Sequence, residues 1–469
     1  MNESRVFLAK AQQKSADEIH RLKIQKAIAT YDIKVKSTKN RQFYDWQKAR
    51  KKAAQIKDDA LANLPDLLLQ FEENTSKNGT HVLWAENALQ ARQHIRDIIK
   101  KHHAEKIVKS KSMTTEEIEL NEFLDEMGVE NWESDLGEFI VQLANEKPYH
   151  IVTPAMHKSQ AEIAELFSRK LGIPATGSAE ELTMAARAAL RQTFVTADIG
   201  ITGANFIIAD TGAIVMTENE GNGRLCMACP KVHIAIVGIE KMLPRLSDLA
   251  LFLPLLATSG TGQQLSCYNS IIRGPKAANE ADGPEKMVVI LLDNRRSEIY
   301  AQDKFRHVLR CLRCGACLNA CPVFRTVGGH TYGTAYQGPI GSVLTPHLRG
   351  MKNWSHLAHA SSLCGACSDV CPVDIDLHHL LLENRWQAEK EKTTPFIWQI
   401  AIKIWAWLHT NRLLLQFVRP ILKLGIAIIK PVLPAKKKRR LPQLAKKSFA
   451  QMWTTAATKS PKKDAISHG

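Results

Sequence analysis

Three patterns of hydrophobic and polar positions follow one another along the chain. Residues 1 to about 110 are rich in charges, nearly free of Gly and Pro, and place apolar residues at helical spacing, as in 60–64 and 94–99. From about 107 to 300, short apolar runs alternate with helical patterns. Beyond residue 395, apolar and aromatic residues mix with Lys and Arg. The first pattern predicts helices, and the second predicts an α/β domain.

Several signals place elements within that α/β region. Apolar runs typical of buried strands occur at 150–153, 205–209, 213–216, 233–237 and 287–291. Ser178 followed by Glu181 predicts a capping box at the start of a helix that continues through Leu190. Residues 210–212 lie between two of the runs and predict a tight hairpin turn.

Length and charge add a domain organisation. A chain of 469 residues, 45% of them hydrophobic, is too long for one core and predicts several folded units. We expect an N-terminal helical region at 1–106, the α/β domain at 107–300, a cysteine-rich segment at 301–390 and a tail at 391–469. The net charge of +16 is concentrated in the tail, where Lys and Arg far outnumber acidic residues.

The N-terminal sequence and the cysteines indicate the compartment. The first residues lack the apolar segment and small-residue cleavage site of a secretory signal. No uninterrupted apolar run reaches the roughly 18 residues of a spanning helix. These features predict a cytoplasmic protein. All ten cysteines lie beyond residue 225, and in a reducing compartment their clustering predicts metal ligation rather than disulfides.

Seven cysteines form two motifs. The first motif, Cys311-x2-Cys314-x2-Cys317-x3-Cys321-Pro322, has the complete bacterial ferredoxin spacing, in which the fourth cysteine ligates the other cluster. The second motif has the same spacing but begins with serine: Ser361-x2-Cys364-x2-Cys367-x3-Cys371-Pro372. The exchange of fourth cysteines predicts one cluster on Cys311, Cys314, Cys317 and Cys371, and another on Cys321, Cys364 and Cys367. Zinc sites and thiol redox pairs fit this pattern less well.

Ser361 leaves the second cluster one thiolate short. Its hydroxyl could ligate the fourth iron, that iron could carry water or an external ligand and act as a Lewis acid, or it could be lost to leave a [3Fe–4S] cluster. The alternative is that Ser361 is an ordinary turn residue.

These motifs resemble a known family. The first motif, the connector at 328–346 and the second motif look like the iron–sulfur subunit of the bacterial lactate-utilisation system. The resemblance extends upstream through 108–113, 135–143 and 197–215, and covers roughly residues 20–390. It implies an α/β lactate-utilisation domain, similar in fold to the sugar-phosphate isomerase and CoA-transferase superfamily, followed by a ferredoxin-like segment that binds two [4Fe–4S] clusters.

The resemblance also implies a role. Members act with two partner proteins in oxidising L-lactate to pyruvate, and this subunit is expected to carry electrons rather than to catalyse; the sequence places no catalytic residue. Serine at the start of the second motif is also the family pattern, which favours three thiolates as the normal state of that cluster. An electron-transfer subunit for another hydroxy acid or a disulfide, and a cluster-based sensor of oxygen or iron, are the alternatives.

Further features of the sequence are candidates for a role in function. Cys226 and Cys229 are either unligated core or turn residues, or a redox pair or auxiliary ligands. Cys267 is expected to be buried and inert. The segments 210–212 and 258–263 are expected to be loops, either simple turns or cradles for an anion. No Gly-rich nucleotide motif is present in the sequence.

The tail has the pattern of an interfacial segment. If residues 412–430 form one helix, its basic residues share a face, namely Arg412, Arg419, Lys423 and Lys430. Upstream are aromatic residues typical of membrane interfaces, namely Phe396, Trp398, Trp405 and Trp407, and residues 436–440 would meet anionic headgroups. We expect peripheral contact with the inner face of the membrane, where an electron acceptor could lie, or docking to a partner subunit. Nucleic acid is not expected, because the aromatics are not interleaved with the basic run.

Overall fold

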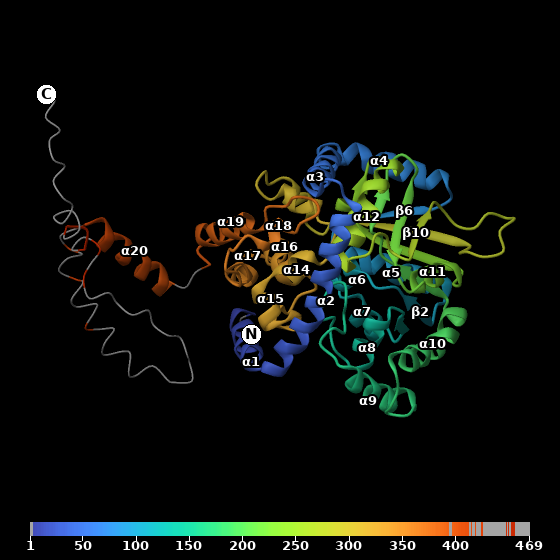
Figure 1. Ribbon diagram of the computed structural model, residues 1–469. Coiled ribbons are helices and arrows are strands. Elements are labelled where there is room, and N and C mark those ends of the chain that lie inside the picture. Colours follow the sequence, from blue (N-terminus) through green and yellow to red (C-terminus); the bar gives the residue numbers. More distant parts are fainter. Residues whose placement is uncertain are drawn as a thin grey trace, which may run out of the picture. The chain divides into compact units, whose positions relative to one another are not determined.

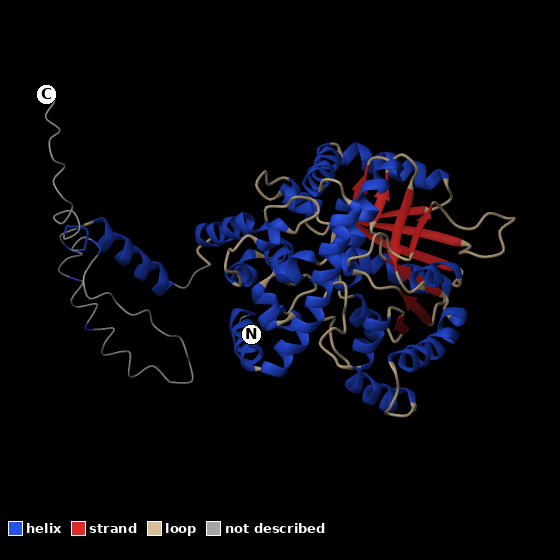
Figure 2. Ribbon diagram, viewed as in Figure 1, coloured by secondary structure: helices blue, strands red, loops and turns tan. Residues whose placement is uncertain are grey.

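The computed structural model describes residues 3–393 and 396–411, together with 414, 418, 424, 447, 449 and 452–454. The chain divides into two units, Met1–Thr393 and Thr394–Gly469. Figure 1 follows the chain through its elements, and Figure 2 shows the strands of the first unit gathered on one side, away from its helical cysteine-rich part.

A six-stranded parallel sheet forms the centre of the α/β region, with the strand order β1-β10-β7-β4-β2-β3. Its strands are β1 His81–Ala85, β2 Lys106–Lys109, β3 Glu130–Glu133, β4 Ile199–Thr202, β7 Val232–Gly238 and β10 Lys286–Leu292. Alternate residues of β7 pack into two separate cores, Val237 in one and Ile236 in the other. The central strands are therefore buried on both faces, which explains their continuous apolar runs.

A second sheet of four strands has the order β8-β5-β6-β9. Its strands are β5 Phe206–Ile208, β6 Ala213–Glu218, β8 Met242–Leu243 and β9 Tyr268–Ile272. Strands β5 and β6 form the predicted antiparallel hairpin, and Gly212 in its turn has the positive φ of 64° that glycine accommodates. The Asp210 carboxylate accepts the Leu246 N–H at 3.2 Å, so this turn is tied to the following segment.

Helices flank the strands of the α/β region. They are α5 Ala88–His102, α6 Met113–Glu117, α7 Leu120–Glu126, α8 Leu136–Leu143, α9 Gln160–Leu171, α10 Ala179–Thr196, α11 Asn222–Ala228, α12 Leu249–Thr261 and α13 Arg296–Tyr300. The Ser178–Glu181 capping box at the start of α10 is confirmed. Helix α11 lies directly on β4, because a Cβ at Gly200 would come within 1.7 Å of the Cys226 carbonyl oxygen. Only glycine permits that approach.

Three sequence expectations are corrected. Strand β1 lies in the region predicted to be helical; it is a short edge strand with only its last residue buried, so its apolar pattern is weak. Residues 150–153 form a turn instead of a strand, since His150 Nδ1 accepts the N–H groups of Val152 and Thr153. Most of 258–263 is the last turn of α12, which ends at Gly262 with φ 72°.

The N-terminal helices pack on the cysteine-rich segment. They are α1 Glu3–Ala16, α2 Glu18–Gln42, α3 Trp46–Ala62 and α4 Leu64–Lys77. Arg325 pairs with Asp32 of α2 at 2.6 Å, and Arg50 of α3 pairs with Asp374 at 2.7 Å. These contacts join residues about 300 positions apart, so the N-terminal region and the cysteine motifs form one body.

Short helices carry the cysteine motifs. They are α14 Ala316–Ala320, α15 Pro322–Val327, α16 Gly338–Arg349, α17 Met351–Trp354, α18 Ala366–Asp369 and α19 Leu377–Lys390. Short 3₁₀ turns complete the fold: η1 Ile239–Lys241, η2 Leu246–Asp248, η3 Arg306–Arg310, η4 Gly329–Tyr332 and η5 Ser355–His359. Phe324 and Leu381 of this segment share one core with Phe206 and Phe252 of the α/β region.

The described part of the second unit consists mainly of α20 Phe396–Thr410. Trp398, Trp405 and Trp407 are exposed on it. Within the described residues, no helix has the length and apolar character needed to cross a membrane. The predicted helix over 412–430 with its face of Arg412, Arg419, Lys423 and Lys430, and the basic run 436–440, lie outside the described residues.

Candidate metal centres and an adjoining pocket

The two cysteine motifs have the same local backbone. The residues before their second positions have positive φ, 62° at Arg313 and 54° at Leu363. The residues after them are glycines with φ 79° at Gly315 and 83° at Gly365, each followed by a short helix. Left-handed backbone on both sides of a cysteine folds the chain into a tight loop. At the position after the cysteine, glycine adopts this conformation without steric strain.

Because the two backbones match, Ser361 in the second motif corresponds to Cys311 in the first. The Arg313 N–H donates to Cys311 Sγ at 3.4 Å, and the Leu363 N–H donates to Ser361 Oγ at 3.1 Å. The hydroxyl of Ser361 therefore occupies, in the second motif, the position that the Cys311 sulfur has in the first.

One group of thiols brings the two motifs together. Burial, together with the charges of nearby Cys311 and Cys371, raises the pKa of Cys314 to about 12. Burial raises the pKa of Cys371 to about 11, again with a contribution from Cys311. Burial raises the pKa of Cys317, and the charges of Cys311, Cys314 and Cys371 contribute to this rise. These mutual charge effects indicate that the four sulfurs lie near one another, although Cys371 belongs to the other motif.

The remaining three cysteines form a second group. Burial, together with the charge of the Cys321 thiolate, raises the pKa of Cys367 to about 11. Cys364 is exposed, and the Ala366 N–H and the Ser362 hydroxyl lower its pKa. Arg385 donates to the Ser361 carbonyl at 3.0 Å, which fixes the entry to this motif. The second group therefore lies closer to solvent than the first.

The surroundings of these thiols fit iron–sulfur clusters. Backbone N–H groups donate to the sulfurs, as from Ile375 to Cys371 at 3.4 Å, and such bonds stabilise cluster thiolates. Burial lowers the pKa of Lys57 to about 7 and of Lys241 to about 8, while the Cys311 thiolate opposes both shifts. An anionic cluster beside them would favour the charged form of both amines.

A buried ionic network adjoins the first group. The Arg296 guanidinium contacts Glu117 at 2.7 Å and also pairs with Glu240, and Arg313 Nη2 lies 3.3 Å from Glu240. With Lys57 and Lys241 this region contains four basic side chains and two carboxylates, namely Lys57, Lys241, Arg296, Arg313, Glu117 and Glu240. The excess of positive charge is consistent with an anionic cluster at the first group.

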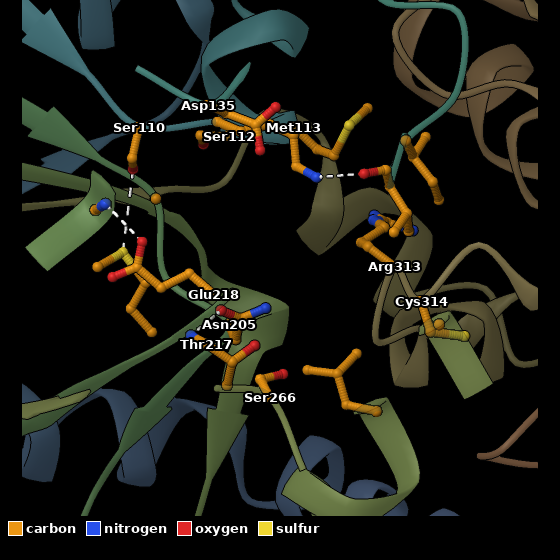
Figure 3. Close-up of a pocket in the computed structure, with 18 of the residues that line it drawn as sticks. Ser110, Ser112, Met113, Asp135, Asn205, Thr217, Glu218, Ser266, Arg313 and Cys314 are labelled. Atoms are coloured by element: carbon orange, nitrogen blue, oxygen red, sulfur yellow. Dashed lines mark hydrogen bonds between the residues drawn. The ribbon is translucent and has the colours of Figure 1, made fainter. Parts of the chain in front are cut away.

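A cavity of about 350 Å³ lies between the α/β region and the first motif (Figure 3). Its walls include residues after β2 and β4, the end of β6, the end of α12, Lys241 and residues 312–314. Strand β2 has β3 on one side and β4 on the other. The strand order therefore changes direction at β2, although all three strands are parallel. The carboxyl ends of parallel strands at such a switch point are the common location of ligand sites.

The acidic side chains of the cavity have backbone partners. Glu218 accepts the N–H groups of Gly223 and Arg224 at 2.6 and 2.9 Å, and Glu220 accepts the Leu136 N–H at 2.9 Å. Burial, followed by the charge of Asp135, raises the pKa of Glu220 to about 7. A carboxyl group with that pKa can exchange a proton near neutrality.

The sequence did not identify this pocket. The segments 108–113 and 197–215, quoted for the family resemblance, contribute Ser110, Ser112 and Asn205 to its walls. The segment 258–263, a candidate anion cradle, contributes Gly260 and Thr261. Arg313 was overlooked although it lies between two predicted ligands; a charged residue inside a ligand loop was the available signal. Lys241 belongs to no recognisable motif, so nothing in the sequence indicated it as a site residue.

The other candidate residues lie apart from the cysteine groups. Cys226 is buried, with its sulfur 3.2 Å from Ser134 Oγ, and Cys229 is exposed; both are free thiols. Cys267 is exposed, which corrects the expectation that it is buried, because it lies in a surface segment before β9. Two histidines between the motifs also have partners outside the cysteine groups: His330 bonds to the Lys147 carbonyl and His347 to the Asn384 side chain.

Two family models match parts of the chain. Residues 68–292 match the LUD domain, and residues 307–375 match the 4Fe-4S dicluster domain. A crystal structure of a DUF162 family protein from Deinococcus radiodurans matches 49% of this chain and 98% of that one, with 14% identity and a TM-score of 0.26.

Curated relatives cover most of the chain. Lactate utilization protein B of Bacillus licheniformis is 47% identical over 361 residues, 76% of each chain. The protein of that name from Bacillus subtilis is also 47% identical over 361 residues, 76% of this chain and 75% of the other. With this identity over three quarters of both proteins, the chain belongs to the lactate utilization protein B family, with a LUD domain followed by a 4Fe-4S dicluster domain.

Proposed function

We propose that this protein is the iron–sulfur electron-transfer subunit of a system that oxidises L-lactate to pyruvate together with two further proteins. The name of its relatives supports the connection with lactate, and the dicluster match supports the cofactor. Electron transfer for another hydroxy acid or a disulfide, or a sensor function, are the alternatives.

In this proposal the cysteines hold two [4Fe–4S] clusters. The first is held by Cys311, Cys314, Cys317 and Cys371, and the second by Cys321, Cys364 and Cys367, with the Ser361 hydroxyl at the fourth position. The observation that carries the proposal is the matched backbone of the two motifs, in which Cys311 Sγ and Ser361 Oγ accept equivalent N–H bonds. A [3Fe–4S] cluster is the alternative for the second site.

When bound, such clusters supply one-electron carriers whose potentials depend on charge, hydrogen bonds to sulfur and exposure to solvent. The two sites differ in charge and in exposure to solvent. At the first site Cys314 and Cys371 are buried, and the adjacent cations favour negative charge there. Exposed Cys364 brings the second site to the surface, where a partner protein could approach it. We therefore assign the first site to the interior end of the path and the second to the exit.

The second unit suggests where the acceptor lies. Helix α20 exposes Ile397, Trp398, Ile404 and Trp405, and its polar residues Gln399 and Lys403 are one turn apart. Such a helix, followed by a basic segment, suits the interface of an anionic membrane. We propose a cytoplasmic protein in peripheral contact with the inner face of the membrane. Sedimentation with anionic vesicles tests this, and binding retained by the variant Trp398→Ser/Trp405→Ser would contradict it.

The central experiment is anaerobic purification of the full chain, followed by iron and sulfide analysis and EPR before and after dithionite reduction. We expect about eight irons, four for each cluster. Addition of L-lactate with the two partner proteins should then reduce the clusters, whereas D-lactate should not. About four irons, or zinc in their place, would contradict the two-cluster assignment; eight irons without lactate-driven reduction would contradict the role in lactate oxidation.

A further inference from the structure

We infer that the cavity beside the first motif is a binding site for a small hydroxy- or oxo-carboxylate, whose carboxylate group meets Arg313 and Lys241. The inference deepens the proposed function and rests on it for the identity of Cys314 as a cluster ligand. It assigns to this subunit a ligand of its own, in addition to two electron carriers.

Arg313 carries the argument. Its side chain is buried, and the residue lies between Cys311 and Cys314 and lines the cavity. Its guanidinium packs 4.4 Å from the centre of the Tyr336 ring, and Nη2 lies 3.3 Å from Glu240. Its Nε and Nη1 atoms are buried without a hydrogen-bond partner among the described residues. Buried donors without acceptors are costly, and the planar guanidinium fork matches a carboxylate.

Lys241 adds a second cation to the same wall. It follows strand β7 in the 3₁₀ turn η1, is largely buried and lines the cavity. The carboxylate of neighbouring Glu240 already pairs with Arg296 and Arg313, and Lys241 forms no ion pair within the described part of the chain. Two buried cations facing one cavity therefore favour an anionic occupant.

The opposite side of the cavity narrows the class of anion. Figure 3 shows Asp135 and Glu218 across the cavity from Arg313 and Cys314. Carboxylates there repel a second negative charge but accept a hydrogen bond from a hydroxyl group. Ser110 and Asn205 also line this side and could bond to a hydroxyl or carbonyl oxygen. A monoanion with an oxygen on its adjacent carbon fits this arrangement better than a dianionic phosphate.

The position of the cavity links its occupant to the first cluster alone. Cys314 is one of the lining residues, and Gly260 at the end of α12 is so close that an added Cβ would lie 3.3 Å from the Cys314 carbonyl oxygen. None of the three cysteines of the second group lines the cavity. Binding should therefore alter the EPR spectrum of the first cluster and leave that of the second unchanged.

The test is calorimetric titration of the anaerobically purified full chain, with its iron content measured first. The probes are L-lactate, pyruvate, inorganic phosphate and lactamide, the neutral amide of lactate. We expect one site for the two carboxylates, no measurable binding of lactamide, and an L-lactate-dependent change in one EPR signal. Tight binding of phosphate without carboxylate binding would overturn the assigned class, and no binding to protein with about eight irons would overturn the site itself.

Variants at the two ends of β7 provide a matched control. Lys241→Gln should weaken carboxylate binding about tenfold or more, whereas Lys231→Gln, the same charge change at exposed Lys231 before the strand, should not. Arg313→Gln should have the larger effect. If Arg313→Gln fails to assemble its clusters, Lys241→Gln and the cavity-filling Ser266→Trp decide the question; unchanged affinity in both would overturn the proposal. Absence of iron from the anaerobically purified wild-type chain would instead count against the proposed function.

Discussion

The two cysteine motifs present nearly the same backbone in different environments. Both place left-handed residues around their second position and start a short helix at the following glycine. The first motif is covered by the α/β region and faces a buried set of cations. The second has Cys364 exposed and Ser361 half-buried.

This difference teaches that a cluster motif specifies ligands but not surroundings. Arg313 and Leu363 are equivalent positions with similar φ, yet Arg313 joins a buried ionic network and Leu363 does not. Reduction potential and access depend on charge and exposure, so the two sites should differ in both. The following predictions test that contrast, beginning with the largest effect.

Removal of one thiol from each group should have unequal consequences. Cys314→Ala should prevent assembly of the first cluster. The neighbouring buried cations then lose the negative charge of that cluster, which should lower the free energy of unfolding by about 3–5 kcal/mol. Cys364→Ala should leave the first cluster's EPR signal and the thermal stability nearly unchanged. Iron analysis, EPR and anaerobic thermal denaturation measure these effects, and equal losses in both variants would remove the contrast.

Chelation should release iron in two phases. The first phase should contain about four irons and bleach the second cluster's signal, because Cys364 is exposed while Cys314 is buried. Stopped samples analysed by EPR during incubation with a chelator follow both signals. Simultaneous decay of the two signals would contradict the assigned difference in exposure.

Arg50 should stabilise the second motif specifically. Its guanidinium donates to the carbonyls of Ser368 and Asp369 at 2.7 and 3.2 Å and pairs with Asp374 at 2.7 Å. Arg50→Ala should lower the free energy of unfolding by about 2 kcal/mol and hasten the first phase of iron release. Lys51→Ala, on the exposed side of the same helix, is the control; a similar change in both would make the effect nonspecific.

Substitution of Ser361 should have the smallest energetic effect and the sharpest spectroscopic one. Ser361→Ala removes the bond from the Leu363 N–H and should cost about 1 kcal/mol. Ser361→Cys supplies a thiol at the position equivalent to Cys311 and should slow the first phase of iron release. Only the second cluster's EPR signal should change in either variant; unchanged spectra in both would make Ser361 a turn residue.

Sequence reasoning was successful where the signal is local. The hairpin at 210–212 and the Ser178–Glu181 capping box were predicted, since each depends on a few adjacent residues. The strand predicted at 150–153 was wrong, because the His150 ring accepts hydrogen bonds from the following N–H groups and bends an otherwise strand-like segment. Strand β1 was missed because an edge strand needs few buried residues.

The sequence by itself determined the residue types of the two motifs, their spacing and the serine at the start of the second, because two-residue spacings constrain only neighbouring backbone. It also determined the buried central strands, whose apolar runs require cover on both faces. Only the tertiary structure decided which motif is buried, and it brought Arg313, Lys241 and Asp135 to one cavity. Burial and charge compensation depend on segments far apart in the chain, and local sequence carries no record of those contacts.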